Sequence, residues 1–232
     1  CNILEAIRVT SPDTRMFFAS SSEIFGHDTH GELLDESSTR YPTNPYAISK
    51  LSADYFIKMY REKYGLFACS GILFNHEGPL RGGQFVSRKI THNIARLKLK
   101  NGEPITLGNL NASRDWGAAM DYVKAMWLML VADDPKDFVI ATGELSTVRD
   151  FLKLSALEVG FDPVFEGEGE NELCIDNSTG MKIAKVSKLY FRPFDTLPLA
   201  GNPLKIESDL GWKRTVNFEQ LISIMVKADI DR

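Results

Sequence analysis

The sequence has few cysteines, and none of them stands in a pattern that binds a metal or builds a disulfide framework. Cys1, Cys69 and Cys174 are scattered along the 232 residues, and an odd count at such spacing is typical of a protein in a reducing setting. We therefore expect a cytoplasmic protein that binds no metal.

Long apolar runs and basic clusters are also missing. No stretch approaches the length of a membrane-spanning helix, and no signal peptide is visible. The formal net charge of −4 at pH 7, without clustered lysines or arginines, argues against a nucleic-acid surface. Neither a membrane nor a nucleic acid is an expected partner. The 44% apolar and 25% charged residues are ordinary values for a globular protein of one large or two small domains.

The sequence lacks one further feature, a glycine-rich turn between a strand and a helix. A Gly-x-x-Gly-x-x-Gly run at such a turn is how a dinucleotide fold binds the pyrophosphate of its cofactor. No such run occurs anywhere in the chain, which begins without a methionine in a segment that is already helical by period.

Residues Tyr41–Lys50 carry the first pattern that points to chemistry. Pro45 suits the first turn of a helix, and Asn44 before it is a good N-cap. Tyr46 and Lys50 are four residues apart, so their side chains leave the same face of this helix. An ammonium favours the anionic form of a neighbouring phenol, which would make Tyr46 a usable general base. The motif alone is common, and by itself it is more typical of a half-buried tyrosine and a solvated lysine on an ordinary amphipathic helix.

Two apolar segments that flank this helix favour the catalytic interpretation of Tyr46 and Lys50. Arg15–Ser20 is predicted to be a strand, and Glu23 follows its carboxyl end. Leu66–Phe74 is predicted to be a second buried strand, followed by Asn75 and His76. Ligands bind at the carboxyl ends of strands in open α/β sheets, so polar side chains from both strands are expected at one edge.

Three motifs now follow one another along the chain: Ser-Ser-Ser-Glu after one strand, Tyr-x-x-x-Lys on a helix, and Phe-Asn-His-Glu after the next strand. With these motifs the sequence resembles the extended short-chain dehydrogenase/reductase superfamily, and most closely the GDP-mannose 4,6-dehydratase family. The resemblance covers nearly the whole chain. It continues through Gly71-Ile-Leu-Phe-Asn-His-Glu, Phe85-Val-Ser-Arg-Lys-Ile-Thr, Leu107-Gly-Asn-Leu-Asn-Ala-Ser-Arg-Asp-Trp-Gly, Asp137-Phe-Val-Ile-Ala-Thr-Gly-Glu, Tyr190-Phe-Arg-Pro and Leu210-Gly-Trp-Lys.

Strands that alternate with helices predict an α/β fold with a doubly wound parallel sheet. The resemblance implies that this sheet is Rossmann-like, with its N-terminal strands and glycine-rich turn missing from the chain. It also implies a smaller α/β substrate domain. We expect the dinucleotide-binding domain over residues 1–79 and about 118–145, and the nucleotide-sugar domain over about 80–117 and 146–232.

Periodicity predicts where further elements lie. The helix from Pro45 should continue to about Tyr64, with Leu51, Tyr55, Phe56 and Tyr60 in the core. Further helices are expected over 85–99, 121–132, 147–159 (capped by Ser146) and 218–230, and short strands over 105–107 and 138–142. Residues 160–188 show only a weak strand near Cys174.

The resemblance implies a lyase that converts GDP-mannose to GDP-4-keto-6-deoxymannose with NADP, the first step towards GDP-6-deoxyhexoses such as GDP-fucose. Tyr46, supported by Lys50, would take the proton of the C4 hydroxyl. Glu23 would remove the C5 proton, and Ser21 would protonate the departing C6 hydroxyl. Glu23 carries most of the discrimination, because simple epimerases of the superfamily do not need this carboxylate.

Binding residues are also implied by the resemblance. Cofactor contacts are expected from Tyr46, Lys50, Leu73, Asn75, His76 and Arg81. Contacts with the nucleotide sugar are expected from Asn75, Lys89, Arg114 and Arg192. A planar guanidinium matches phosphate oxygens, and two arginines on different loops can hold one diphosphate. Full-length members of the family are expected to form homo-oligomers.

The chain departs from the family pattern at several positions. Thr43 and Leu80 replace arginines, and Met120 replaces a basic residue. Ala118 stands where a histidine is usual, and Gln84 where a threonine is common. Less positive charge near a diphosphate would weaken binding. The exact nucleotide sugar therefore stays open, and so do another dehydratase or epimerase of the superfamily, or a non-catalytic truncated remnant. Activity of this chain alone is doubtful without the glycine-rich turn.

Overall fold

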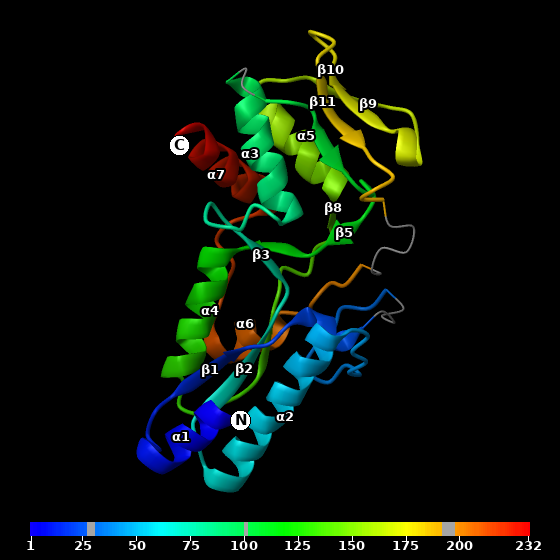
Figure 1. Cartoon of the computed structure of the whole chain (residues 1–232). Helices are drawn as coiled ribbons and strands as arrows, with labels where there is room; N and C mark the ends of the chain where they lie inside the picture. Colours follow the sequence, from blue (N-terminus) through cyan, green and yellow to red (C-terminus); the bar gives the residue numbers. More distant parts are fainter. Residues whose placement is uncertain (27–30, 100–101, 192–197) are drawn as a thin grey trace. The chain divides into compact units, whose positions relative to one another are not determined.

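The computed structural model describes residues 1–26, 31–99, 102–191 and 198–232 (Figure 1). The chain divides into two compact units, and it passes between them several times. The first unit contains Cys1–His76, Asp115–Glu144 and Leu199–Thr215, and the second contains Glu77–Arg114, Leu145–Pro198 and Val216–Arg232. The segment Leu199–Thr215 belongs to the first unit, although the sequence placed it in the second.

A three-stranded parallel sheet forms the centre of the first unit. Its strand order is β1 (Met16–Ala19), β2 (Ala68–Leu73), β7 (Phe138–Ile140). β1 pairs with β2 in the register Met16 to Ala68, and β2 pairs with β7 in the register Gly71 to Phe138. The predicted parallel α/β sheet is thus confirmed.

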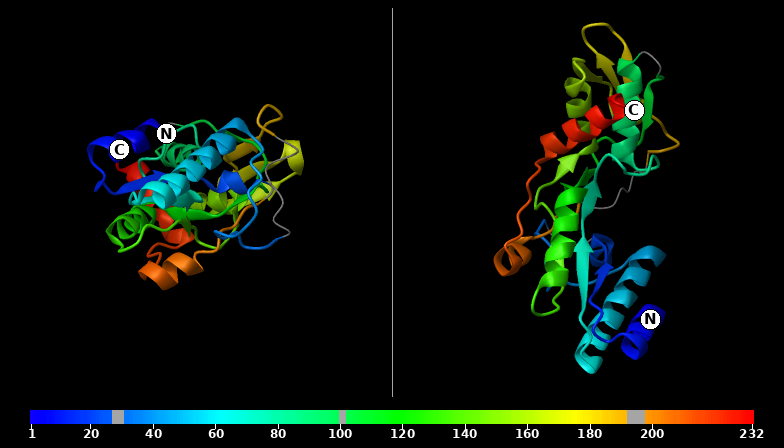
Figure 2. Two further views of the ribbon diagram at one scale, coloured as in Figure 1. Left: turned by 90° about the horizontal axis from the view of Figure 1, so that it is seen from below. Right: turned by 90° about the vertical axis from the view of Figure 1, so that its left-hand side faces the viewer.

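Helices cover both faces of this sheet. The α-helices described in the first unit are α1 (Asn2–Thr10), α2 (Pro45–Tyr64), α4 (Ala119–Val131) and α6 (Leu204–Leu210). α1 and α2 pack with Met16 and Phe18 on one face, whereas α4 and α6 pack with Phe17 on the other. In the right-hand view of Figure 2, α2 and α4 lie on opposite sides of β2. The sheet is therefore doubly wound, as the sequence predicted. α6 was not predicted, because seven residues are too few to show a helical period.

The second unit combines a mixed sheet with three helices. The sheet has the order β4 (Ile105–Leu107), β11 (Lys182–Val186), β10 (Leu173–Asp176), β9 (Pro163–Glu166). β4 runs parallel to β11, and the other pairs are antiparallel. α3 (Val86–Lys98), α5 (Val148–Glu158) and α7 (Phe218–Ile230) pack against one another. Two of the three strands between residues 160 and 188 were missed, because each has only four or five residues between glycine-rich turns.

The remaining elements are short. They are β3 (Asn75–Glu77), β5 (Ser113–Arg114), β6 (Trp116–Ala118), β8 (Ser146–Thr147) and the 3₁₀ helices η1 (Ser22–Phe25) and η2 (Gly169–Asn171). β3 pairs with β6, and β5 pairs with β8. Within the described ranges, no helix combines the length and the apolar composition that crossing a membrane requires.

Helix α2 begins and ends as the sequence predicted. Asn44 caps it, because its Oδ1 accepts a hydrogen bond from the backbone N–H of Ala47 at 2.8 Å, and Pro45 occupies the first turn. Gly65 ends the helix in the left-handed conformation, with φ of 68°. These local signals set the two ends of α2.

The predicted core face of α2 is wrong in part. Tyr60 is buried and Leu51 is partly buried, but Tyr55 is 62% exposed and Phe56 is 40% exposed. The buried side chains of the helix are Ala47, Ile57 and Tyr60. The helix packs on the sheet through these residues, so the face that carries Tyr55 and Phe56 points away from it.

Other helices agree with their predicted positions to within two residues at each end. Ile90, Ile94 and Leu97 of α3 are buried as predicted, and Asn217 caps α7. The predicted cap of α5 is wrong by one position. Thr147, not Ser146, forms the cap, because its side chain and that of Asp150 satisfy each other's backbone N–H groups.

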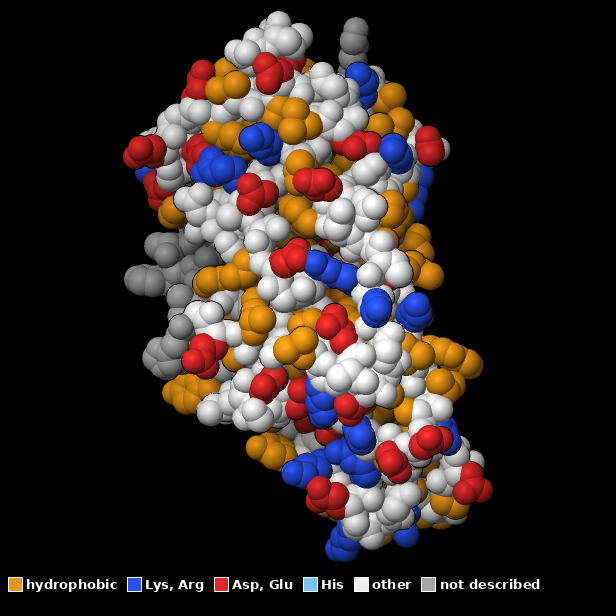
Figure 3. All heavy atoms as spheres, turned by 180° about the vertical axis from the view of Figure 1, so that it is seen from behind, with side chains coloured by type: hydrophobic (Ala, Val, Ile, Leu, Met, Phe, Trp, Pro, Cys, Tyr) orange, Lys and Arg blue, Asp and Glu red, His pale blue; other side chains and the backbone are white. Residues whose placement is uncertain are grey.

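The first unit exposes apolar surface beside its sheet. β1 pairs with β2, and no second partner strand lies beside β1 among the described residues. On α4, Met120, Val123, Trp127 and Val131 follow at three- or four-residue spacing and are 49–76% exposed. On the face shown in Figure 3, apolar side chains are interspersed with charges of both signs. An uncovered strand edge next to an apolar helix face promotes association between chains.

We expect the 232-residue chain, produced by itself, to associate in solution through this apolar surface. Trp127→Lys should reduce the association, because it places a charge in the middle of the α4 face. Leu157→Lys, at an exposed leucine of α5, is the matched control and should leave it unchanged. Light scattering across a concentration series provides the measurement. A monodisperse parent chain would contradict this interpretation.

Candidate active site

The turn after β1 holds two of the predicted catalytic residues. Ser21 is the N-cap of η1, and its Oγ accepts a hydrogen bond from the backbone N–H of Glu23 at 3.3 Å. Ser20 continues the sheet beyond β1, since its N–H donates to the carbonyl of Gly71 at 2.9 Å. Ser21 and the exposed Glu23 therefore lie on one tight turn at the carboxyl end of the parallel sheet.

Asn44 connects this turn to helix α2. Its Oδ1 caps the helix through Ala47, which leaves Nδ2 to donate to Glu23 Oε2 at 2.7 Å. The cap fixes the orientation of the amide, so the Glu23 carboxylate is held beside the first turn of α2. The positive end of the helix dipole favours a carboxylate there. The second role of Asn44 was not predicted, because the sequence gives no sign that the cap amide and Glu23 meet.

Tyr46 and Lys50 follow on the same helix. The Lys50 ammonium donates to the carbonyl of Ala19 at 2.7 Å and lies 5.5 Å from the centre of the Tyr46 ring. The Tyr46 side chain is largely open to solvent, with 51% of its surface exposed. The structure thus brings Tyr46 and Lys50 to the sheet edge that also carries Ser21 and Glu23.

The end of β2 contributes the next group. Leu73 is buried, and Asn75 and His76 are partly buried in β3. His76 Nδ1 lies 2.9 Å from the carbonyl oxygen of Phe74, which can only accept, so Nδ1 carries the hydrogen. The imidazole also stacks on Tyr122, with ring centres 5.0 Å apart. Because β1 and β2 are parallel neighbours, these residues belong to the same edge as Glu23 and Tyr46.

The predicted binding residues Arg81 and Lys89 lie in the second unit and have partners there. Arg81 Nε is 3.1 Å from an oxygen of the buried Glu77, and its guanidinium lies 3.5 Å from the centre of the Phe85 ring. Burial raises the pKa of Glu77. The Lys89 ammonium is 4.5 Å from the centre of the Tyr190 ring, and burial lowers the pKa of Lys89. Their predicted contacts with cofactor and nucleotide sugar stay predictions.

Of the two arginines predicted to bind the diphosphate, the structure describes one. Arg114 lies in β5, partly buried, and donates to the carbonyl of Ser113 at 2.7 Å. Arg192 lies outside the described residues. Among the departures from the family pattern, Leu80 is 90% exposed and Met120 is 76% exposed, whereas Ala118 is buried at the end of β6.

Asp115 is a buried carboxylate that sequence reasoning missed. It accepts hydrogen bonds from the N–H and hydroxyl of Thr142 at 2.8 and 2.6 Å. It also accepts from the N–H groups of Gly143 and Gly201 at 3.0 and 3.1 Å. Burial raises the pKa of Asp115, although these bonds oppose the rise. The Asp115 side chain therefore joins both ends of the segment Asp115–Glu144 to the segment Leu199–Thr215, directly after Arg114, where the chain enters the first unit. Its place inside the Ser-Arg-Asp-Trp-Gly run was the available signal.

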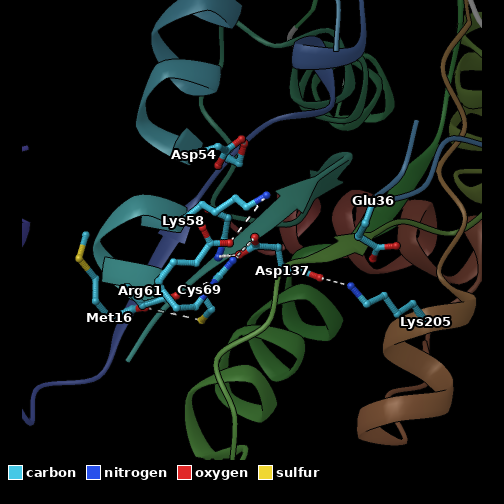
Figure 4. Close-up of polar contacts among 12 residues, drawn as sticks. Met16, Glu36, Asp54, Lys58, Arg61, Cys69, Asp137 and Lys205 are labelled. Atoms are coloured by element: carbon cyan, nitrogen blue, oxygen red, sulfur yellow. Dashed lines mark hydrogen bonds and ion pairs between the residues drawn. The ribbon is translucent and has the colours of Figure 1, made fainter. Parts of the chain in front are cut away.

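A separate pocket of about 460 Å³ lies in the first unit beside α2. Arg61 and Asp137 form an ion pair of 2.7 Å in it, and Lys205 donates to the carbonyl of Asp137 (Figure 4). None of the predicted catalytic residues lines this pocket. In the part of the chain that the structure describes, no group of three or more His, Cys, Asp or Glu side chains could hold a metal ion.

Comparisons of the sequence with known proteins give one consistent family. The model of the GDP-mannose 4,6 dehydratase family matches residues 1–225. GDP-mannose 4,6 dehydratase 2 of Caenorhabditis elegans is 44% identical over 227 residues, which are 98% of this chain and 59% of that protein. The Homo sapiens GDP-mannose 4,6 dehydratase is 43% identical over 232 residues, 99% of this chain and 62% of that protein. The chain thus spans about three fifths of the length of these curated relatives.

Solved structures are similar in fold. RMD from Pseudomonas aeruginosa complexed with NADPH matches with a TM-score of 0.85 at 20% identity, over 100% of this chain and 71% of that one. The dTDP-glucose 4,6-dehydratase of Bacillus anthracis in complex with NAD matches with a TM-score of 0.76 at 19% identity, over 97% and 64%. At such identities the likeness shows the fold alone, which is that of the Rossmann-type sheet expected from the sequence.

Proposed function

The chain belongs to the GDP-mannose 4,6-dehydratase family, and from this premise we propose that Ser21, Glu23, Tyr46 and Lys50 are the catalytic group of such an enzyme. The proposed reaction converts GDP-mannose to GDP-4-keto-6-deoxymannose, the first step towards GDP-6-deoxyhexoses such as GDP-fucose, in a cytoplasmic setting. The observation that carries the proposal is the hydrogen bond of 2.7 Å from Asn44 to Glu23, since it fixes a carboxylate beside the helix of Tyr46 and Lys50.

A nicotinamide cofactor would supply the acceptor for hydride from C4 of the hexose and would return that hydride at C6. We propose NADP, which the NADPH complex of the Pseudomonas aeruginosa neighbour supports. The described residues fit the nicotinamide end, because a half-exposed phenol and the end of β2 lie at one sheet edge. We propose that Tyr46, Lys50, Leu73, Asn75, His76 and Arg81 hold the cofactor. The chain contains no glycine-rich turn for its pyrophosphate.

Tyr46 accepts the proton of the C4 hydroxyl in this proposal. The Lys50 ammonium is anchored by the carbonyl of Ala19 and lies 5.5 Å from the centre of the Tyr46 ring, so its positive charge stays beside the phenol. A base at the hydroxyl is needed because oxidation at C4 releases a proton as well as a hydride. The exposure of Tyr46 leaves its hydroxyl open to a substrate from solvent.

Glu23 and Ser21 carry the elimination. A ketone at C4 makes the C5 proton acidic, and the Glu23 carboxylate removes it. Ser21 gives its hydroxyl proton to the C6 hydroxyl as the C6–O bond breaks and water leaves, and the partly exposed serine takes up a proton from solvent in its place. Since Ser21 Oγ accepts the N–H of Glu23, the hydroxyl hydrogen is directed away from that bond and can be donated. The shared turn keeps the base and the proton donor two residues apart.

The GDP part of the substrate is assigned to Asn75, Lys89, Arg114 and Arg192, which would neutralise and orient the diphosphate. An epimerase of the same superfamily is the second candidate, because UDP-glucose 4-epimerases share the fold. The Glu23 carboxylate favours the dehydratase, since epimerisation at C4 needs no base for C5. The third candidate is a truncated chain that binds a nucleotide sugar without catalysis. Separately, full-length family members are expected to form homo-oligomers.

We expect Glu23→Gln and Tyr46→Phe to stop the reaction at different points. Both are tested in a chimaera in which residues 1–232 replace the matching part of the Caenorhabditis elegans relative. Glu23→Gln should lower product formation by about 10²–10⁴-fold and leave reduced cofactor on the enzyme, because the step before elimination stays possible. Tyr46→Phe should lower turnover without reduced cofactor. Absorbance of the nicotinamide and chromatography of the products measure both.

Glu32→Gln, at an exposed carboxylate of the loop before α2, is the matched control and should turn over normally. Normal turnover by Glu23→Gln would rule out the assigned base. An unsubstituted chimaera that makes no 4-keto-6-deoxy product would overturn the proposed function itself.

Arg114→Ala should weaken binding of GDP to the same chimaera by about 1.5–3 kcal/mol, the contribution of a hydrogen bond to a charged group. Arg192→Ala should have a similar effect, whereas Lys185→Ala, at an exposed lysine of β11, should have none. Calorimetric titration with GDP gives the affinities. If Arg114→Ala binds GDP as the parent does, the diphosphate lies elsewhere.

A further inference from the structure

Asp54 extends the helical row of the predicted catalytic residues by one turn. Tyr46, Lys50 and Asp54 follow one another at four-residue spacing, so their side chains leave neighbouring points on one face of α2. No motif drew attention to Asp54. It is partly buried on α2 (Figure 4), and it is one of the residues that line the pocket beside this helix.

Two side chains of this row hold consecutive residues at the end of β1. Lys50 donates to the carbonyl of Ala19 at 2.7 Å. One turn further along α2, Asp54 Oδ2 accepts a hydrogen bond from the hydroxyl of Ser20 at 2.6 Å. Ser20 is 3% exposed and directly precedes Ser21. The two bonds therefore fix the register of the helix against the strand that leads into the Ser21–Glu23 turn.

Burying the Asp54 carboxylate to make this hydrogen bond costs folding free energy. Its second oxygen, Oδ1, is buried and has no hydrogen-bond partner among the described residues. Burial raises the pKa of Asp54, and the hydrogen bond from Ser20, the nearby Ser70 hydroxyl and the Arg40 guanidinium offset that rise only in part. An incompletely satisfied buried carboxylate destabilises a fold. Stability alone therefore does not account for an acidic residue here, whereas a strong acceptor for Ser20 does.

We propose that Asp54 is a positioning residue, which holds Ser20 and thereby keeps Ser21 and Glu23 in place relative to Tyr46 on α2. This inference rests on the proposed function for its kinetic consequences. Tyr46 stays on the helix when the bond is lost, and Lys50 still holds Ala19. The turn with Ser21 and Glu23 loses one of its supports. The elimination should thus suffer more than the proton transfer at Tyr46.

The test uses Asp54→Ala, Ser20→Ala and the double variant in the chimaera. Each single variant should lower kcat by about ten- to a hundredfold, the effect of a small misplacement of reacting groups. KM for GDP-mannose should stay within about twofold, and reduced cofactor should accumulate with substrate. The double variant should be no slower than either single one, because both remove the same bond. Asp54→Asn keeps an acceptor oxygen and should retain most of the activity.

Tyr60→Phe is the matched control, because it removes another hydrogen bond of α2, from Tyr60 to Glu5 of α1 at 3.0 Å. It should leave kcat unchanged. Hydrogen exchange provides a readout besides activity. In Asp54→Ala the amides of Glu23, Ile24 and Gly26, which are bonded within the turn, should exchange about tenfold faster, and in Tyr60→Phe they should not change.

Three results would each overturn the positioning role. They are kcat of Asp54→Ala within twofold of the parent, losses that multiply in the double variant, and unchanged exchange of the turn amides. If the unsubstituted chimaera is inactive, the proposed function fails, while the exchange experiment still decides whether Asp54 holds the turn. If Asp54→Ala does not fold, Ser20→Ala provides the same comparison.

Discussion

The hydrogen bond from Lys50 to the carbonyl of Ala19 couples helix α2 to strand β1, and the geometry of the candidate site depends on that coupling. α2 carries Tyr46, the turn after β1 carries Ser21 and Glu23, and neither element alone brings these three side chains together. Asn44 adds a second connection, because one amide caps the helix and holds the Glu23 carboxylate. The site is thus built on rigid elements at the carboxyl edge of a parallel sheet, where ligands of such sheets bind.

Buried carboxylates hold the first unit together where the chain leaves it. Asp115 bonds the segments around Thr142 and Gly201, and Asp121 accepts hydrogen bonds from the N–H and hydroxyl of Thr215 at 2.9 and 2.6 Å. Thr142 and Thr215 lie within two residues of a point where the chain passes to the second unit. The chain passes between the two units in irregular segments that form few backbone hydrogen bonds of their own. Buried backbone groups of such segments must find partners, and these carboxylates provide them. Each unit can then keep its own core.

Local signals in the sequence predicted much of this structure. Pro45, Asn44 and Gly65 define α2 to the residue, and the apolar run of β2 identifies a buried parallel strand. The signals fail where tertiary packing decides. Tyr55 and Phe56 are apolar but face away from the sheet, and α6 is too short to show a period. In the site, spacing predicted that Tyr46 and Lys50 share a face. The bonds from Asn44 to Glu23 and from Ser20 to Asp54 join residues 21 and 34 positions apart, which no local pattern reveals.

In the proposed reaction, the residues of α2 and of the turn after β1 carry out an internal oxidation, elimination and reduction on one hexose. Mass spectrometry and NMR of the product made by the chimaera from GDP-mannose deuterated at C4 test it most directly. We expect GDP-4-keto-6-deoxymannose with the deuterium at C6, because hydride taken from C4 returns within the same active site. An epimer that keeps deuterium at C4, or a 6-deoxy product without the label, would contradict it.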